Sequence, residues 1–88
     1  MSLLDAIDNF YEHLVVEAVE RTRDPEDSQD FLVDVMCVAL NRLPTRYYRH
    51  SVDLMFYMAD PEYQQMLKAV EEAVAGARTF VRAHRRDL

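Results

Sequence analysis

The chain has 88 residues and a formal net charge of −6, with one Gly, three Pro and one Cys. This length allows one domain and excludes a Rossmann unit with a substrate domain or a barrel enzyme. Half of the residues are hydrophobic, and the scarcity of Gly and Pro leaves little material for the turns of a sandwich or barrel. We therefore predict a single all-α domain over residues 1–88.

The first predicted helix begins at the capping residue Ser2 and ends before Pro25. Its apolar positions recur at helical spacing, at Leu3, Ile7, Phe10, Leu14 and Ala18.

An acidic loop over residues 24–30 follows and offers Asp27 and Ser28 as caps for a second helix, which ends at about Leu43 because Pro44 comes next. Nearly every position from 35 to 40 is apolar, so we expect this helix to be central and surrounded by the others. Within that run, Cys37 is expected to be a small buried hydrophobe.

Residues 44–50 have no helical stripe and are predicted to form an ordered, exposed connection. Residues 51–58 fit either a strand or a short helix, and we favour a short helix or an extended segment packed on the bundle. The sequence Asp60-Pro61-Glu62, with Asp60 as the cap, predicts the start of a last helix that reaches His84 and contains Gly76. The fold class is thus a small bundle of three main helices.

The apolar stripes exceed what three helices in one chain can cover, and a symmetric homodimer would bury the remainder. The acidic N-terminus does not resemble a signal peptide, and no apolar run approaches the ~18 residues of a membrane span. We therefore predict a cytoplasmic protein with no membrane association.

The charges are distributed unevenly. Residues 1–34 carry a net charge of −8 and residues 53–77 carry −4, whereas residues 35–52 and 78–88 each carry +3. The second basic segment contains four arginines, at Arg78, Arg82, Arg85 and Arg86. Solvated surface charge at helix ends is the simpler explanation of both basic segments.

No catalytic or metal-binding pattern is present in the sequence. The three histidines lie in three different segments, Cys37 is the single cysteine, and one Gly cannot form a Gly-rich phosphate loop. We predict a protein that is not an enzyme and has no metal and no cofactor.

The most informative segment is residues 41–50, which contain three Arg, two Tyr and one His around a helix end and a proline. Arginine can hold a phosphate or a guanine edge, and a tyrosine ring can stack on a base. A long DNA or RNA is disfavoured by the net charge of −6. The segment therefore indicates a compact ligand with few phosphates, bound by Arg42, Arg46 and Arg49.

The same segment resembles the ComFB family, named for late competence development. Residues 39–47 read Ala-Leu-Asn-Arg-Leu-Pro-Thr-Arg-Tyr and are similar to the family pattern Ala-Leu-Asn-x-Leu-Pro-Pro-x-Tyr. Asp34 stands where the family often has an acid. Residues 9–15 resemble the family's first-helix motif, and residues 48–57 resemble its proteobacterial branch, so the resemblance covers most of the chain.

The resemblance implies a small, helical, dimeric bacterial signalling domain without enzyme activity that binds a cyclic dinucleotide, notably cyclic di-GMP. The matching motif positions are Asn41, Arg46 and Tyr47, to which the chemistry of the segment adds Arg42 and Arg49 as ligand-binding candidates. Thr45 replaces the usual second proline. The cysteines that suggest zinc in some Firmicute members are absent, so no metal is transferred.

An alternative is a regulatory dimer that binds partner proteins and no small molecule. In that case Pro44 ends the second helix, Tyr47 packs under the bundle, and Arg46 pairs with an acid such as Asp34 or Asp53. The burial of these side chains distinguishes the two hypotheses.

Overall fold

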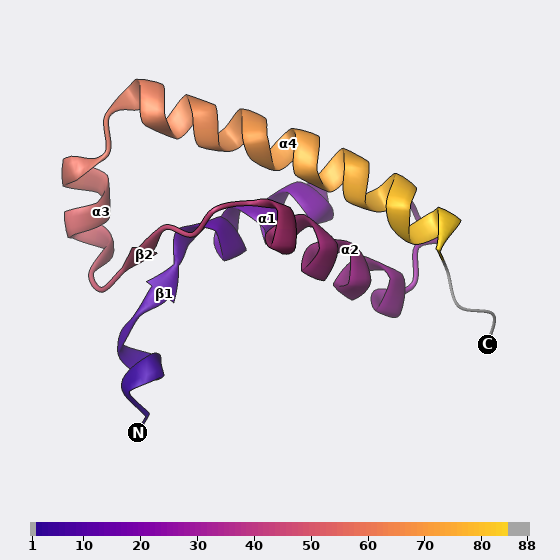
Figure 1. Ribbon diagram of the computed structural model, residues 1–88, viewed down its shortest axis with the longest axis horizontal. Helices are drawn as coiled ribbons and strands as arrows, with labels where there is room; N and C mark the ends of the chain where they lie inside the picture. The colour runs from indigo at the N-terminus through magenta and orange to yellow at the C-terminus, as the bar shows by residue number, and fades with distance from the viewer. Residues whose placement is uncertain (1, 85–88) are drawn as a thin grey trace.

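The computed structural model describes residues 2–84 and confirms an all-α domain (Figure 1). Three long helices form the body of the molecule, while a short helix and two very short strands lie at one end of it. In chain order the elements are η1 (Leu3–Ala6), β1 (Asp8–Asn9), α1 (Phe10–Thr22), α2 (Gln29–Arg42), β2 (Tyr47–Tyr48), α3 (Ser51–Tyr57) and α4 (Asp60–Ala83).

The hydrophobic core lies between α1, α2 and α4. Each long helix contributes one fully buried valine, and these are Val15, Val35 and Val70. All three helices contact one another, so α2 is not surrounded as predicted. One side of α2 faces solvent, which leaves Val33 and Cys37 exposed. The prediction of a buried Cys37 was therefore wrong, because only two long helices are available to cover α2.

The predicted first helix is interrupted before Phe10. Ser2 caps only the 3-10 turn η1, the backbone is extended at Ile7, and Asn9 caps α1 by accepting a hydrogen bond from the backbone N–H of Tyr11. A short polar side chain such as Asn9 favours a helix start over a helix interior. Consequently Leu3 and Ile7, which extended the apolar stripe in the sequence, are exposed.

The connection after α2 contains a strand that the sequence analysis missed. β2 pairs in antiparallel register with β1, with Asp8 opposite Tyr48 and Asn9 opposite Tyr47. Two-residue strands have no recognisable alternation, so periodicity cannot detect them. This ribbon ties the start of α1 to the connection between α2 and α3.

The remaining helix boundaries agree closely with the predictions. Ser28 caps α2 by accepting a hydrogen bond from the N–H of Phe31, and residues 51–57 form the short helix α3. The last helix begins at Asp60, with Ala59 rather than Asp60 as its N-cap. Within residues 2–84, no helix is both long enough and apolar enough to cross a lipid bilayer.

Candidate functional site

The backbone at Arg46 is attached to the start of α1. The N–H of Arg46 donates a 2.8 Å hydrogen bond to Oδ1 of Asn9, and the carbonyl of Arg46 accepts one of 2.8 Å from the N–H of Phe10. Asn9 is buried, and the same oxygen caps α1. Two hydrogen bonds therefore fix the main chain of Arg46 independently of its side chain.

The side chain of Arg46 forms an ion pair with the first turn of α4. Its Nη1 lies 3.1 Å from Oε2 of Glu62, and the two side chains are 37% and 39% exposed. The sequence analysis suggested Asp34 or Asp53 as the partner of Arg46. Glu62 takes that place because the connection after α2 lies beside the start of α4.

Arg46 and Glu62 line an open concavity of about 380 Å³, which we call the Arg46 concavity. Pro44, Met66 and Ala69 form apolar parts of its wall, and Tyr11 lines it as well. Burial raises the pKa of Tyr11, and the carboxylate of Glu62 raises it further, while the guanidinium of Arg46 opposes the shift. The concavity thus combines apolar walls, a neutral phenol, one cation and one anion.

Arg42 lies elsewhere on the molecule. Its guanidinium carbon is 5.1 Å from the centre of the Phe80 ring, and its Nη1 lies beside Gly76. Gly76 follows Glu62 by 14 positions on α4, which corresponds to about 21 Å at 1.5 Å per residue. Arg42 and Arg46 are therefore not brought together within one chain.

The other three candidate residues, Asn41, Tyr47 and Arg49, are exposed. Tyr47 is 58% exposed and does not pack under the bundle. The tyrosine that packs is Tyr48, whose ring meets Phe10 edge-on and whose hydroxyl donates to Asp8. Burial raises the pKa of Tyr48, and the Asp8 carboxylate adds to the shift. Tyr47 is thus exposed, but it does not line the Arg46 concavity.

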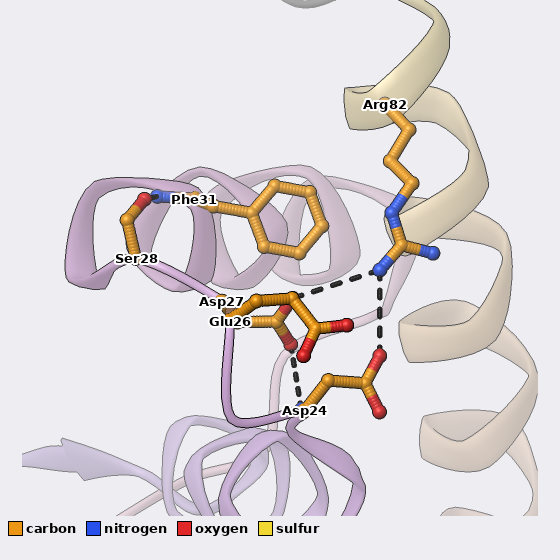
Figure 2. A pocket seen from close by; sticks show the side chains of 6 residues that line it. All are labelled: Asp24, Glu26, Asp27, Ser28, Phe31 and Arg82. Atoms are coloured by element: carbon orange, nitrogen blue, oxygen red, sulfur yellow. Dashed lines mark hydrogen bonds and ion pairs between the residues drawn. The ribbon is translucent and has the colours of Figure 1, made fainter.

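In the second basic segment, Arg78 and Arg82 are neutralised by the loop between α1 and α2. Nη2 of Arg78 lies 2.8 Å from Asp27 and 3.2 Å from Asp24. Nη2 of Arg82 lies 3.6 Å from Asp27 and 3.5 Å from Asp24, and Figure 2 shows these two contacts. Both guanidinium groups also lie 5.3 Å from the centre of the Phe31 ring. Arg85 and Arg86 lie outside the described residues.

Asp27 is the centre of this charged cluster. Its side chain is 4% exposed, and that of Arg78 is 12% exposed. The backbone N–H of Asp24 lowers the pKa of Asp27 most, and the Arg78 guanidinium lowers it further. Asp27 thus accepts a hydrogen bond from the loop backbone and pairs with an arginine of α4, while the neighbouring Ser28 caps α2.

The described histidines make separate contacts in different parts of the molecule. In the part of the chain that the structure describes, no three His, Cys, Asp or Glu side chains converge as metal ligands do. His13 contacts Asp8, and His84 stacks on Phe80 at 4.0 Å. A wider depression of about 590 Å³ between α2 and the end of α4 is lined by Cys37 and His84, among others.

Two residues of the Arg46 concavity were not identified as functional from the sequence. Glu62 was interpreted only as part of the start of the last helix, and Tyr11 was given no functional role.

A family model described as Late competence development protein ComFB matches residues 8–85. The chain belongs to the ComFB family. The match begins at the first residue of β1, so it includes every residue of the Arg46 concavity and excludes η1. No curated protein and no solved structure matches this ComFB chain.

Proposed function

We propose that this ComFB protein is a non-enzymatic bacterial signalling receptor for a cyclic dinucleotide, with cyclic di-GMP favoured, and that it works in the cytoplasm. The observation that carries the proposal is the setting of Arg46. Its backbone is fixed by Asn9 and Phe10, and its guanidinium lines the open Arg46 concavity. The ring of Tyr47, the next residue in the chain, is exposed. A held arginine at an open concavity suits the polar edge of a base, and an exposed aromatic ring in the same segment suits base stacking.

The charges of the segment support a ligand with few phosphates. Residues 35–52 contain three arginines and no acid, within a chain of net charge −6. Arg49 lies exposed on the same connection as Arg46 and is the candidate that we propose for a ligand phosphate. Asn41 and Arg42 lie exposed at the end of α2 and remain further ligand-binding candidates of the same segment.

Isothermal titration calorimetry with cyclic di-GMP and cyclic di-AMP tests the proposal, with GMP as a control for a single nucleotide. We expect saturable heat with at least one cyclic dinucleotide and weaker binding of GMP. The absence of heat at high micromolar cyclic dinucleotide, with folded protein in the cell, would contradict the proposed function.

A second candidate function is a regulatory dimer without a small ligand, and the exposed apolar side chains of α3 favour it. Phe56 is 81% exposed, and Val52, Met55 and Tyr57 are also exposed. Antiparallel pairing of β1 with β2 brings η1, with exposed Leu3 and Leu4, to the same end of the molecule as α3 (Figure 1). Apolar surface of this extent usually marks an interaction site.

A second copy of this chain is the occupant that we propose for this end. A two-fold interface must be self-complementary, because the same patch meets itself. Asp5 and Asp53 lie on η1 and α3, and Arg49 and His50 lie at the turn before α3, so the patch carries both signs of charge.

Light scattering tests the dimer. We expect the wild-type protein and Val33→Asp, which alters an exposed site on α2, to be dimeric at micromolar concentration. Phe56→Asp, at the end with α3, is expected to be monomeric. A monomeric wild-type protein would contradict the dimer, and a dimeric Phe56→Asp variant would contradict its proposed location. A dimer that gives no heat with either cyclic dinucleotide would favour this second candidate over the receptor.

A further inference from the structure

The Arg46–Glu62 ion pair offers one hydrogen-bond donor group beside two acceptor oxygens. Nη1 of Arg46 lies 3.1 Å from Oε2 of Glu62, and both side chains line the Arg46 concavity. More than a third of each side chain is exposed, so a ligand can reach both groups without breaking the fold.

The Watson–Crick edge of guanine has the complementary pattern. It presents the acceptor O6, then the donor N1–H, then the donor N2–H₂. A guanidinium can donate to O6 while a carboxylate accepts from N1–H and N2–H₂. Adenine presents a donor, N6–H₂, where guanine has O6, and an acceptor, N1, where guanine has N1–H. In the same pose, the donor N6–H₂ of adenine would face the Arg46 guanidinium, which is also a donor. The acceptor N1 would face the Glu62 carboxylate, which is also an acceptor.

We propose that Glu62 is the specificity-determining residue of this site, and that the Arg46–Glu62 pair selects a guanine base over an adenine base. This inference rests on the proposed function, because it concerns the base of the proposed cyclic dinucleotide. In this proposal the Arg46–Glu62 pair binds the base of the ligand and not a phosphate. The pair has no net charge, and the Glu62 carboxylate would repel a phosphate placed against Arg46.

The walls of the concavity suit a flat base. Pro44, Met66 and Ala69 offer apolar surface to the faces of a purine, and the charged pair stands at its polar edge. Ligand sites commonly combine apolar walls with a few polar groups that fix orientation. Tyr11 adds a neutral hydroxyl, since burial and Glu62 both raise the pKa of that phenol.

Glu62→Gln tests the inference, because the amide keeps the shape of the side chain and replaces one acceptor oxygen by a donor. The matched control is Glu71→Gln, an exposed position on the same helix. The affinities of wild type and both variants for cyclic di-GMP and cyclic di-AMP are measured by calorimetry. Circular dichroism melting checks that each variant is folded.

We expect the wild-type protein and Glu71→Gln to prefer cyclic di-GMP by about 5- to 150-fold, the range for one bidentate base contact. Glu62→Gln should lose most of this preference through weaker binding of cyclic di-GMP. Equal affinities in the wild type, an unchanged preference in Glu62→Gln, or tighter binding of both ligands by Glu62→Gln would overturn the inference and leave the receptor function standing. Binding of neither ligand by the wild type would overturn both.

Discussion

At the C-terminal half of α4, Arg78 and Arg82 point into the loop between α1 and α2, where two aspartates and one phenyl ring meet them. In the connection after α2, Arg46 has one carboxylate partner that is itself more than a third exposed, and it faces an open concavity. Residues 78–88 and residues 35–52 have the same net charge of +3. Within residues 78–88, however, the two described arginines form ion pairs inside the fold.

The difference shows that the surroundings of an arginine decide its role more than the local charge count does. Arg78 is 12% exposed, so its ion pairs form in a setting where water screens them little. The Arg46–Glu62 pair is partly solvated, and such pairs contribute little to stability. Of Arg46 and Arg78, Arg46 is therefore the one whose charge the fold uses less.

The largest expected effect belongs to Arg78→Met. Removal of one partner from a largely buried ion pair leaves the carboxylate of Asp27 without its nearest cation, and we expect a loss of about 3 kcal/mol in the free energy of unfolding. The matched control Arg82→Met, at an exposed neighbour in the same cluster, should lose less than about 1 kcal/mol. Urea denaturation measures both losses in the free energy of unfolding. Equal losses would show that the burial of Arg78 does not strengthen its ion pairs.

The same cluster predicts a dependence of stability on pH. The native pKa of Asp27 lies below its ordinary value of 3.8, chiefly through the backbone N–H of Asp24 and then Arg78. The resulting stabilisation is present above pH 3.8 and is lost as the pH falls through the native pKa. Thermal melting between pH 7 and pH 3 should show a smaller decline for Asp27→Asn than for the wild type. Parallel curves for the two proteins would contradict this assignment.

Replacement of Arg46 should have a smaller effect on stability. Arg46→Ala removes a partly exposed ion pair, while the backbone hydrogen bonds to Asn9 and Phe10 remain, so we expect a loss below about 1 kcal/mol in urea denaturation. A loss as large as that of Arg78→Met would show that Arg46 is a structural residue and would remove the contrast between the two segments.

Gly76→Ala should have the smallest effect and should be stabilising. An added Cβ would lie 3.1 Å from Nη1 of Arg42, which is the flexible end of a side chain and can move away. Alanine is favoured over glycine in a helix interior by about 0.5–1 kcal/mol, so the melting temperature should rise. A fall in the melting temperature would show that Arg42 is fixed between Gly76 and Phe80 and is not available to a ligand.

Local signals in the sequence predicted most of the helical framework. The serine at position 28, the proline at position 44 and the run Asp60-Pro61-Glu62 each act within one turn of a helix end, and the corresponding boundaries agree to within one residue or so. The first helix was predicted too long because Leu3 and Ile7 continue the apolar period of α1. The break at Asn9 depends on a hydrogen bond to Arg46, 37 residues away, which periodicity does not report.

The candidate site was predicted only in part, for the same reason. Arg46 and Tyr47 stand out because their chemistry is visible in the segment itself. Glu62 lies 16 positions beyond Arg46 and also serves as a first-turn acid of α4, so nothing in its sequence context indicates an ion pair. Arg42 and Arg46 are close in sequence, but the end of α2 directs their guanidinium groups to different parts of α4.

The central claim is that Arg46 contacts a cyclic dinucleotide. Titration of cyclic di-GMP into the wild-type protein, Arg46→Ala and Arg21→Ala tests it most directly, because Arg21 is an exposed arginine in the last turn of α1. We predict saturable binding by the wild type, unchanged affinity for Arg21→Ala, and an affinity about 10- to 150-fold weaker for Arg46→Ala, as expected for a lost charged hydrogen bond. Equal affinity for Arg46→Ala and the wild type, or no binding by the wild type, would contradict the account.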